Sequence, residues 1–165
     1  MSPPRRGLHA EPSALSRSAR CYHCGGEVRV GRRALTAMCP QCYRGIELAD
    51  MTIRKPVVQP SMATCGTLVV LTKGSIEAEW ILATEELIVH GMISGHTRCW
   101  GRVWLGPSAR VRGSLRAPQV DIEAGAVIEG ALIQIGAFCK SDLNATLDDE
   151  ICAPEQIQRA ISARP

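Results

Sequence analysis

The feature that most constrains how this chain folds is a repeat of alternating aliphatic residues with an offset of 17 positions. One unit contains Val103, Leu105, Ala109, Val111, Gly113, Leu115 and Ala117, and the next contains Val120, Ile122, Ala126, Ile128, Gly130 and Leu132. Alternation of this kind places the aliphatic side chains on one face of short β-strands. Three such segments per unit, separated by corners, predict the triangular coil of a β-helix.

Two earlier units extend the repeat toward the N-terminus. In one of them, at an offset of 18, the aligned pairs are Leu87 with Leu105, Ile93 with Val111, Gly95 with Gly113 and Cys99 with Ala117. The other contains Leu68, Val70, Ile76 and Ala78, and an insertion at residues 80–84 blurs its register. We therefore expect an all-β fold with about four coils over residues 66–138, stacked at the strand spacing of ~4.8 Å.

The composition agrees with a repeat. Hydrophobic residues make up 45% of the 165 residues, but aromatic residues only 4%. A rounded core draws much of its buried area from aromatic rings, so this balance favours thin, strand-rich layers. No apolar run approaches the roughly 18 residues of a membrane span, and the N-terminus lacks the apolar centre of a secretory signal. These features predict a cytoplasmic protein without a transmembrane segment.

The chain contains eight cysteines. In a reducing cytoplasm such a number favours metal binding, and secretion with four disulfides is the alternative. Four of them form two pairs of the pattern C-x2-C, separated by fourteen residues: Cys21, Cys24, Cys39 and Cys42. Two residues between thiolates let one turn direct both sulfurs at a single ion, and four thiolates complete a tetrahedral Zn²⁺ site.

Residues 21–48 thus resemble a zinc ribbon in which Zn²⁺ has a structural role. Iron in a rubredoxin-like centre is the alternative for the metal. His23 lies inside the first turn and is not expected to be a ligand. Zinc ribbons often contact nucleic acids or proteins, and the arginines of this segment suit phosphate contacts as well as solubility.

The remaining segments are predicted from composition. Residues 1–20 are expected to be a disordered basic tail, and the proline-containing residues 49–65 an extended linker. Residues 139–165 form an acidic tail in which residues 153–163 have the pattern of a short helix. Residues 1–55 carry ten Lys or Arg against four acids, which allows this end to approach nucleic acid or anionic lipid.

The segments Leu87–His96 and Val103–Gln134, and most specifically residues 106–130, resemble the bactofilin family of polymer-forming bacterial cytoskeletal proteins. The resemblance implies a right-handed parallel β-helix that assembles head-to-head into filaments without nucleotide. It also implies a scaffold that positions cell-envelope enzymes or chromosome-segregation factors, at the membrane or the nucleoid. The cysteine ribbon and basic tail replace the short, often membrane-binding tail of typical members.

The C-terminal end of the repeat is the expected polymer contact. A stack of coils ends in unpaired strand edges and apolar side chains, and it needs a polar cap to stay monomeric. The residues that crowd at this end are Leu132, Ile133, Ile135 and Phe138. We expect them to contact a second copy; capping by residues 153–163 is the alternative.

A second surface is suggested by five arginines in a stretch without acids: Arg98, Arg102, Arg110, Arg112 and Arg116. Arg98 and Arg116 should point outward and lie one above the other, and an anionic partner would relieve their repulsion. A solvated face that prevents sideways aggregation is the alternative.

Two other functions compete with the scaffold. One is a nucleic-acid-binding adaptor in which the coils multiply the contacts of the ribbon. The other is an enzyme with a left-handed β-helix, similar to hexapeptide-repeat acyltransferases, which use histidine as base or metal ligand. His90 and His96 lie six positions apart and on different faces. No catalytic constellation is evident, so we predict that the protein is not an enzyme.

Overall fold

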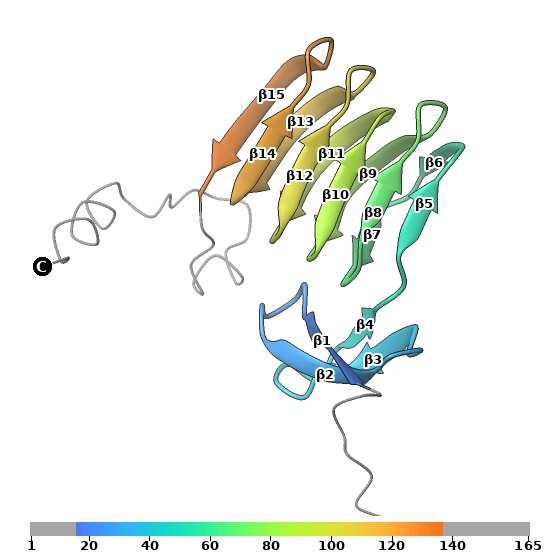
Figure 1. Ribbon diagram of the computed structural model, residues 1–165, viewed down its shortest axis with the longest axis vertical. Coiled ribbons are helices and arrows are strands. Elements are labelled where there is room, and N and C mark those ends of the chain that lie inside the picture. Colours follow the sequence, from blue (N-terminus) through green and yellow to red (C-terminus); the bar gives the residue numbers. More distant parts are fainter. Residues whose placement is uncertain (1–15, 137–165) are drawn as a thin grey trace, which may run out of the picture.

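The computed structural model of the protein describes residues 16–136, and every regular element in this range is a β-strand. Figure 1 shows two parts: a stack of parallel strands, and a small four-stranded module at the lower ends of those strands. The predicted all-β fold is confirmed. The expectations for Phe138 and for residues 139–165 lie outside the described residues.

The stack is a parallel β-solenoid of about five coils. One sheet has the strand order β14-β12-β10-β8-β5, with one short strand from each coil. The strands are β5 (Met51–Ile53), β8 (Leu68–Val70), β10 (Glu86–Val89), β12 (Arg102–Leu105) and β14 (Gln119–Ile122). The other sheet has the order β15-β13-β11-β9-β6, and β7 also pairs with β9. Its strands are β6 (Pro56–Val58), β7 (Ser61–Thr64), β9 (Ser75–Ala83), β11 (Met92–Cys99), β13 (Arg110–Ala117) and β15 (Val127–Ile135).

The long strands of the second sheet change register near their middle. The pairing of β11 with β9 shifts between Ser94 and His96. Gly95 lies at this point with φ +134°, and a Cβ there would collide with the carbonyl oxygen of Ala78. In the first coil the two halves are the separate strands β6 and β7, which pair with the two halves of β9. Each coil therefore contributes three straight segments, as the repeat predicts.

The core consists of the inward-facing aliphatic side chains of the inner coils. In the first sheet Leu68, Leu87 and Val103 form one column of directly paired residues. The fully buried set also includes Val70, Ile76, Ile81, Val89, Ile93, Leu105, Val111 and Leu115. Burying a side chain of this size stabilises a protein by about 1.5–3 kcal/mol. Since no large ring is needed between layers this thin, the low aromatic content is explained.

The predicted alignment of Leu87 with Leu105 is wrong. Leu87 pairs with Val103, and Val89 pairs with Leu105, so the local offset is 16. The corner after β10 has two residues, whereas residues 106–109 form a four-residue corner after β12. The offset therefore becomes 18 beyond these corners, where Ile93 does pair with Val111 as predicted.

The predicted alignment of Leu132 with Leu115 is also wrong. Leu115 pairs with Ile133, and Leu132 lies opposite Ser114 with 62% of its surface exposed. The register of β13 and β15 shifts after Arg112, because β15 contains one additional residue in its bend. This additional residue turns Leu132 outward and Ile133 inward.

Residues 51–64 are strands of the first coil, so the expected linker at residues 49–65 is wrong. Met51–Ile53 pairs with Leu68–Val70, and Pro56 lies opposite Ser75. Proline is tolerated here because β6 is an edge strand, which needs no further partner for its backbone nitrogen. The solenoid thus has about five coils, one more than expected. At the other end of the ribbon, Ser16–Arg20 is a strand and not part of a disordered tail.

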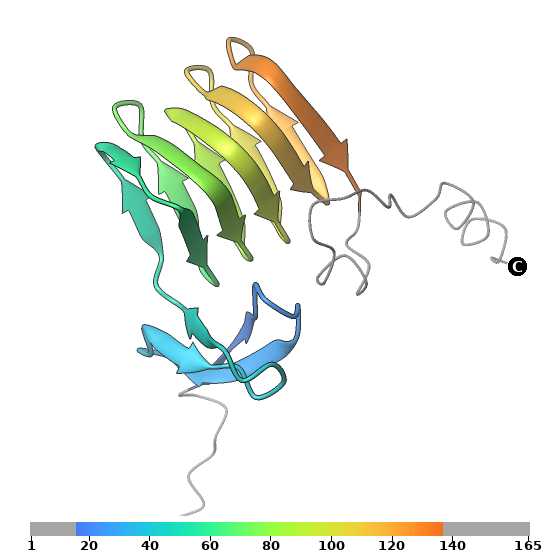
Figure 2. The ribbon, with the colours of Figure 1, turned by 180° about the vertical axis from the view of Figure 1, so that it is seen from behind.

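The small module is built from two antiparallel pairs. One pair is β1 (Ser16–Arg20) with β2 (Glu27–Gly31), and the other is β3 (Thr36–Met38) with β4 (Gly45–Glu47). Its core contains Ala19, Cys21, Val28, Val30, Cys39, Ile46, Leu48 and Cys65. In Figure 2, the reverse view, the module again lies below the strand ends, and β4 leads directly into the first coil. We refer to residues 16–48 as the ribbon.

Candidate metal centre and assembly surfaces

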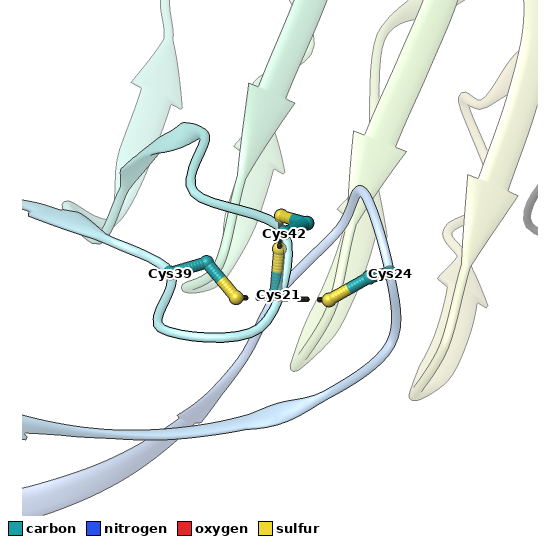
Figure 3. A group of neighbouring side chains, drawn as sticks. All are labelled: Cys21, Cys24, Cys39 and Cys42. Atoms are coloured by element: carbon teal, nitrogen blue, oxygen red, sulfur yellow. Dashed lines mark hydrogen bonds between the residues drawn. The ribbon is translucent and has the colours of Figure 1, made fainter.

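The four paired cysteines of the ribbon meet at one point. Cys21 and Cys24 lie in the turn between β1 and β2, and Cys39 and Cys42 lie in the turn between β3 and β4. Figure 3 shows the four side chains directed toward one another. Their sulfur atoms all lie within 4.8 Å of one another. The Sγ–Sγ distance is 3.8 Å from Cys21 to Cys42 and 3.6 Å from Cys24 to Cys39. Zinc–sulfur bonds of ~2.3 Å in a tetrahedron place the sulfurs ~3.8 Å apart, so the cluster fits this ion.

The two turns have the same backbone geometry. In the first, the Cys21 amide donates to the Gly26 carbonyl and the Gly25 amide donates to the Cys21 carbonyl. In the second, the amides of Cys39 and Tyr43 make the equivalent bonds with the carbonyls of Arg44 and Cys39. Gly25 and Tyr43 occupy the same position and both have positive φ, 68° and 56°. Two equivalent turns therefore present their sulfurs from opposite sides of the site.

The surroundings of the sulfurs affect their ionisation in different directions. Burial raises the pKa of Cys21 and of Cys24. Burial also opposes ionisation of Cys39, but the backbone amides of Cys42 and Gln41 and the Cys24 thiol outweigh it and lower the Cys39 pKa to about 7. Amide donors stabilise a thiolate, which is the form that binds metal. Burial and then Arg44 lower the pKa of His23, which is not part of the cluster.

The last coil exposes aliphatic residues that face inward in every other coil. Ile122 continues the buried column of Leu105, and Ile128 continues that of Val111. Ile122 is 50% exposed and Ile128 is 37% exposed, because β14 and β15 are edge strands. Ile122 and Ile128 were recognised as members of the repeat but were not predicted as polymer contacts, although their position in the last repeat is sufficient to predict their exposure.

The predicted polymer-contact residues are divided between core and surface. Ile135 is 66% exposed at the end of β15, and Leu132 is exposed on its outer face. Ile133 is half-buried and packs against the solenoid core. Phe138 lies outside the described residues.

The five arginines predicted as one surface lie on different sides of the solenoid. Arg102 is on the first sheet, in β12. In the second sheet, Arg110 and Arg112 precede the bend of β13. Arg98 of β11 and Arg116 of β13 follow the bends of their strands. Arg98 and Arg116 are direct neighbours, as predicted, and the Arg98 guanidinium lies 5.4 Å from the Trp80 ring centroid.

Two of these arginines contact acids of the next coil. Arg102 Nε lies 2.5 Å from Asp121 Oδ2, and an Arg112 guanidinium nitrogen lies 2.6 Å from Glu129 Oε2. The acid-free stretch that suggested this surface ends before Asp121, so the sequence pattern did not predict these partners.

The two histidines of the solenoid pack against tryptophans. The rings of His90 and Trp104 lie 4.8 Å apart edge to face, and those of His96 and Trp80 lie 5.2 Å apart. His96 Nδ1 lies 2.8 Å from Ser114 Oγ. Across residues 16–136, the four cysteines are the one group of side chains placed to hold a metal ion.

Within residues 16–136, the fold and these surfaces define a β-solenoid whose last coil exposes aliphatic side chains and whose first coil is attached to a cysteine-rich module. The family model for bactofilins, described as polymer-forming cytoskeletal, matches residues 49–133. The match spans more than half of the chain, so the protein belongs to the bactofilin family. It begins before the first coil, in agreement with the strands at residues 51–64. No curated protein and no solved structure matches the chain. Within residues 16–136 there is no helix that could cross a membrane.

Proposed function

We propose that this protein is a cytoplasmic scaffold whose solenoids, right-handed as in its family, stack end to end into filaments without nucleotide. The observation that carries this proposal is the exposure of Ile122, Ile128 and Ile135 in the last coil. In the inner coils the paired positions Leu105, Val111 and Ala117 are buried by the next layer. A second solenoid against this end would remove the exposed aliphatic surface from water.

The strand edges support the same contact. Among the strands that the structure describes, β14 and β15 each have a neighbour on one side only, and neither contains a proline. At the other end of the stack, β6 begins with Pro56, which follows Arg54 and Lys55. Prolines and cations on an edge disfavour strand addition. We therefore assign the stronger polymer contact to the C-terminal coil, where a head-to-head joint would form.

Electron microscopy and sedimentation of the purified full chain, without nucleotide, test this proposal. Ile135→Arg should convert filaments into small particles, because a guanidinium would be buried in an apolar joint. Leu35→Arg is the matched control, since Leu35 on the ribbon is equally exposed at 66%. A wild-type chain that stays monomeric at high concentration would refute the proposal. Filaments unchanged by Ile135→Arg would exclude this joint.

We further propose that Cys21, Cys24, Cys39 and Cys42 hold one structural Zn²⁺. The sulfur spacing and the amide donors around Cys39 support this ion. With four thiolates the coordination shell is closed, so the metal would stabilise the ribbon and bind no substrate. Iron binds the same ligand set, and metal analysis of the purified protein distinguishes the two.

A second candidate function is nucleic-acid binding by the ribbon, multiplied along the filament. The ribbon contains six arginines and two glutamates, and five of the arginines are exposed: Arg20, Arg29, Arg32, Arg33 and Arg44. Binding through such a set should weaken steeply with salt. Arg32→Glu with Arg33→Glu should abolish retention of DNA by the filaments, whereas Arg110→Glu on the solenoid should not. If neither variant alters retention, the ribbon is not the nucleic-acid contact, and cell-envelope or chromosome-segregation proteins become the expected partners.

A further inference from the structure

Cys65 belongs to two parts of the molecule. It follows β7 at a corner of the first coil, but it packs in the core of the ribbon together with Cys21, Cys39 and Leu48. Only 2% of Cys65 is exposed, and its thiol is free. The hydrophobic core of the ribbon is therefore completed by a side chain from the solenoid.

The segment that leaves the ribbon takes the place of a preceding coil. The Cys65 amide donates a hydrogen bond of 2.7 Å to the Glu47 carbonyl. Two coils further on, the Trp100 amide makes the corresponding bond to the Ala83 carbonyl, at 3.0 Å. Because the first coil is at the edge of the stack, Glu47 satisfies a donor that has no partner from another coil.

Two threonines extend this contact along the corner. Thr64 Oγ1 donates to the Ala49 carbonyl at 2.6 Å, and the Thr67 amide donates to the Asp50 carboxylate at 2.8 Å. Residues 47–50 are thus hydrogen-bonded along the corner of the first coil and form a partial cap on the N-terminal edge. We call residues 47–50 the capping segment.

The capping segment is held from the other side by the first cysteine turn. The Tyr22 hydroxyl accepts a hydrogen bond of 3.2 Å from the Glu47 amide, and Tyr22 directly follows Cys21. Tyr22 also packs against the ribbon core that contains Cys65. Arg17 of β1 donates to the Leu48 carbonyl at 2.6 Å. The residue that directly follows a predicted metal ligand therefore makes one of the bonds that fix the cap.

We propose that metal binding by the four cysteines holds the capping segment on the first coil, so that the loaded ribbon closes this corner of the N-terminal edge and loss of the metal opens it. This inference rests on the metal binding proposed above. A module as small as the ribbon depends on its metal to stay folded. When the two cysteine turns of the ribbon separate, Tyr22 can no longer hold Glu47 in place. Cys65 then loses the ribbon residues that shield its thiol from solvent.

The rate of thiol alkylation in the full-length chain tests this inference. The protein is loaded with zinc, and N-ethylmaleimide is added with or without a strong zinc chelator, with peptide mass spectrometry to resolve each cysteine. Cys99 is the matched control, because it is buried in the solenoid far from the ribbon in sequence, and burial raises the pKa of both thiols to about 11. With chelator, labelling of Cys65 should accelerate about tenfold or more through local opening, while Cys99 stays slow.

The possible outcomes distinguish the proposed metal site from the proposed dependence of the capping segment on the metal. If the metal leaves and Cys21 and Cys39 react, but Cys65 stays as slow as Cys99, the cap does not depend on the metal, and the metal site stands. If alkylation of Cys65 and of Cys99 accelerates to the same extent, the solenoid unfolds as a whole, and the proposed local opening at the first coil is wrong. If no metal binds at all, both proposals fail. Amide hydrogen exchange gives a second readout: Cys65 should lose protection on metal removal, and Leu115 should keep it.

Discussion

Leu115 pairs with Ile133 across the last two coils, and Leu132, one position earlier on β15, points away from the core. This relationship predicts that truncating the two leucines to alanine lowers the free energy of unfolding by different amounts. Leu115→Ala removes fully buried methyl groups and should destabilise the chain by about 2–5 kcal/mol. Leu132→Ala should change the free energy of unfolding by less than about 0.5 kcal/mol. Urea unfolding of the dissociated chain measures both, and a larger cost for Leu132→Ala would contradict the register.

The bend of the long strands depends on Gly95. Its φ of +134° is accessible to glycine, and a Cβ would collide with the Ala78 carbonyl oxygen of the coil below. Gly95→Ala should therefore cost about 3 kcal/mol or more, through backbone strain and loss of packing. Gly136→Ala is the control, because open space surrounds that position. Equal melting temperatures for the two variants would show that the bend does not require glycine.

The last coil is joined to its neighbour by the pairs Arg102–Asp121 and Arg112–Glu129. All four side chains are well exposed, so each pair should contribute only about 0.2–1 kcal/mol. Asp121→Asn and Glu129→Gln should lower the urea midpoint slightly at low salt and not at high salt. Glu123→Gln, in an exposed acid of the same coil, should leave it unchanged. A loss of several kcal/mol from either pair variant would mean that the pairs are more buried than described.

The metal centre predicts which cysteines the protein needs in order to bind zinc. Cys39→Ser should reduce the zinc content well below one ion per chain and lower the melting temperature of the ribbon, because three thiolates bind zinc less tightly than four. Cys99→Ala should retain the zinc, since Cys99 lies in the solenoid core and outside the cluster. Metal analysis after dialysis measures both. Full zinc content in Cys39→Ser would remove Cys39 from the ligand set.

The repeat predicted the solenoid because inward aliphatic residues alternate in the inner coils, and the spacing of the cysteines predicted their cluster. The first coil was missed because its aliphatic residues are few and its segment contains Pro56 and Pro60, which are typical of linkers. The edge strand β6 tolerates Pro56, and Pro60 lies in the bend between β6 and β7, so neither proline prevents the pairing of this coil with β8 and β9.

The register errors have a different origin. A fixed offset assumes that all corners have equal length, but the corners after β10 and β12 differ by two residues. Similarly, one additional residue in the bend of β15 exchanges the faces of Leu132 and Ile133. The contact of Cys65 with the ribbon joins residues far apart in the sequence, and no local pattern predicts it.

The direct passage from β4 into the first coil has a consequence for the geometry of a filament. Since no flexible tether intervenes, the two ribbons on either side of a C-terminal head-to-head joint would be separated by the combined length of two solenoids. A stack of five coils is about 24 Å long at ~4.8 Å per coil. A coil gained or lost by duplication or deletion would then change the distance between the two ribbons across such a joint by two of these steps, so the number of coils sets the spacing of whatever the ribbons bind.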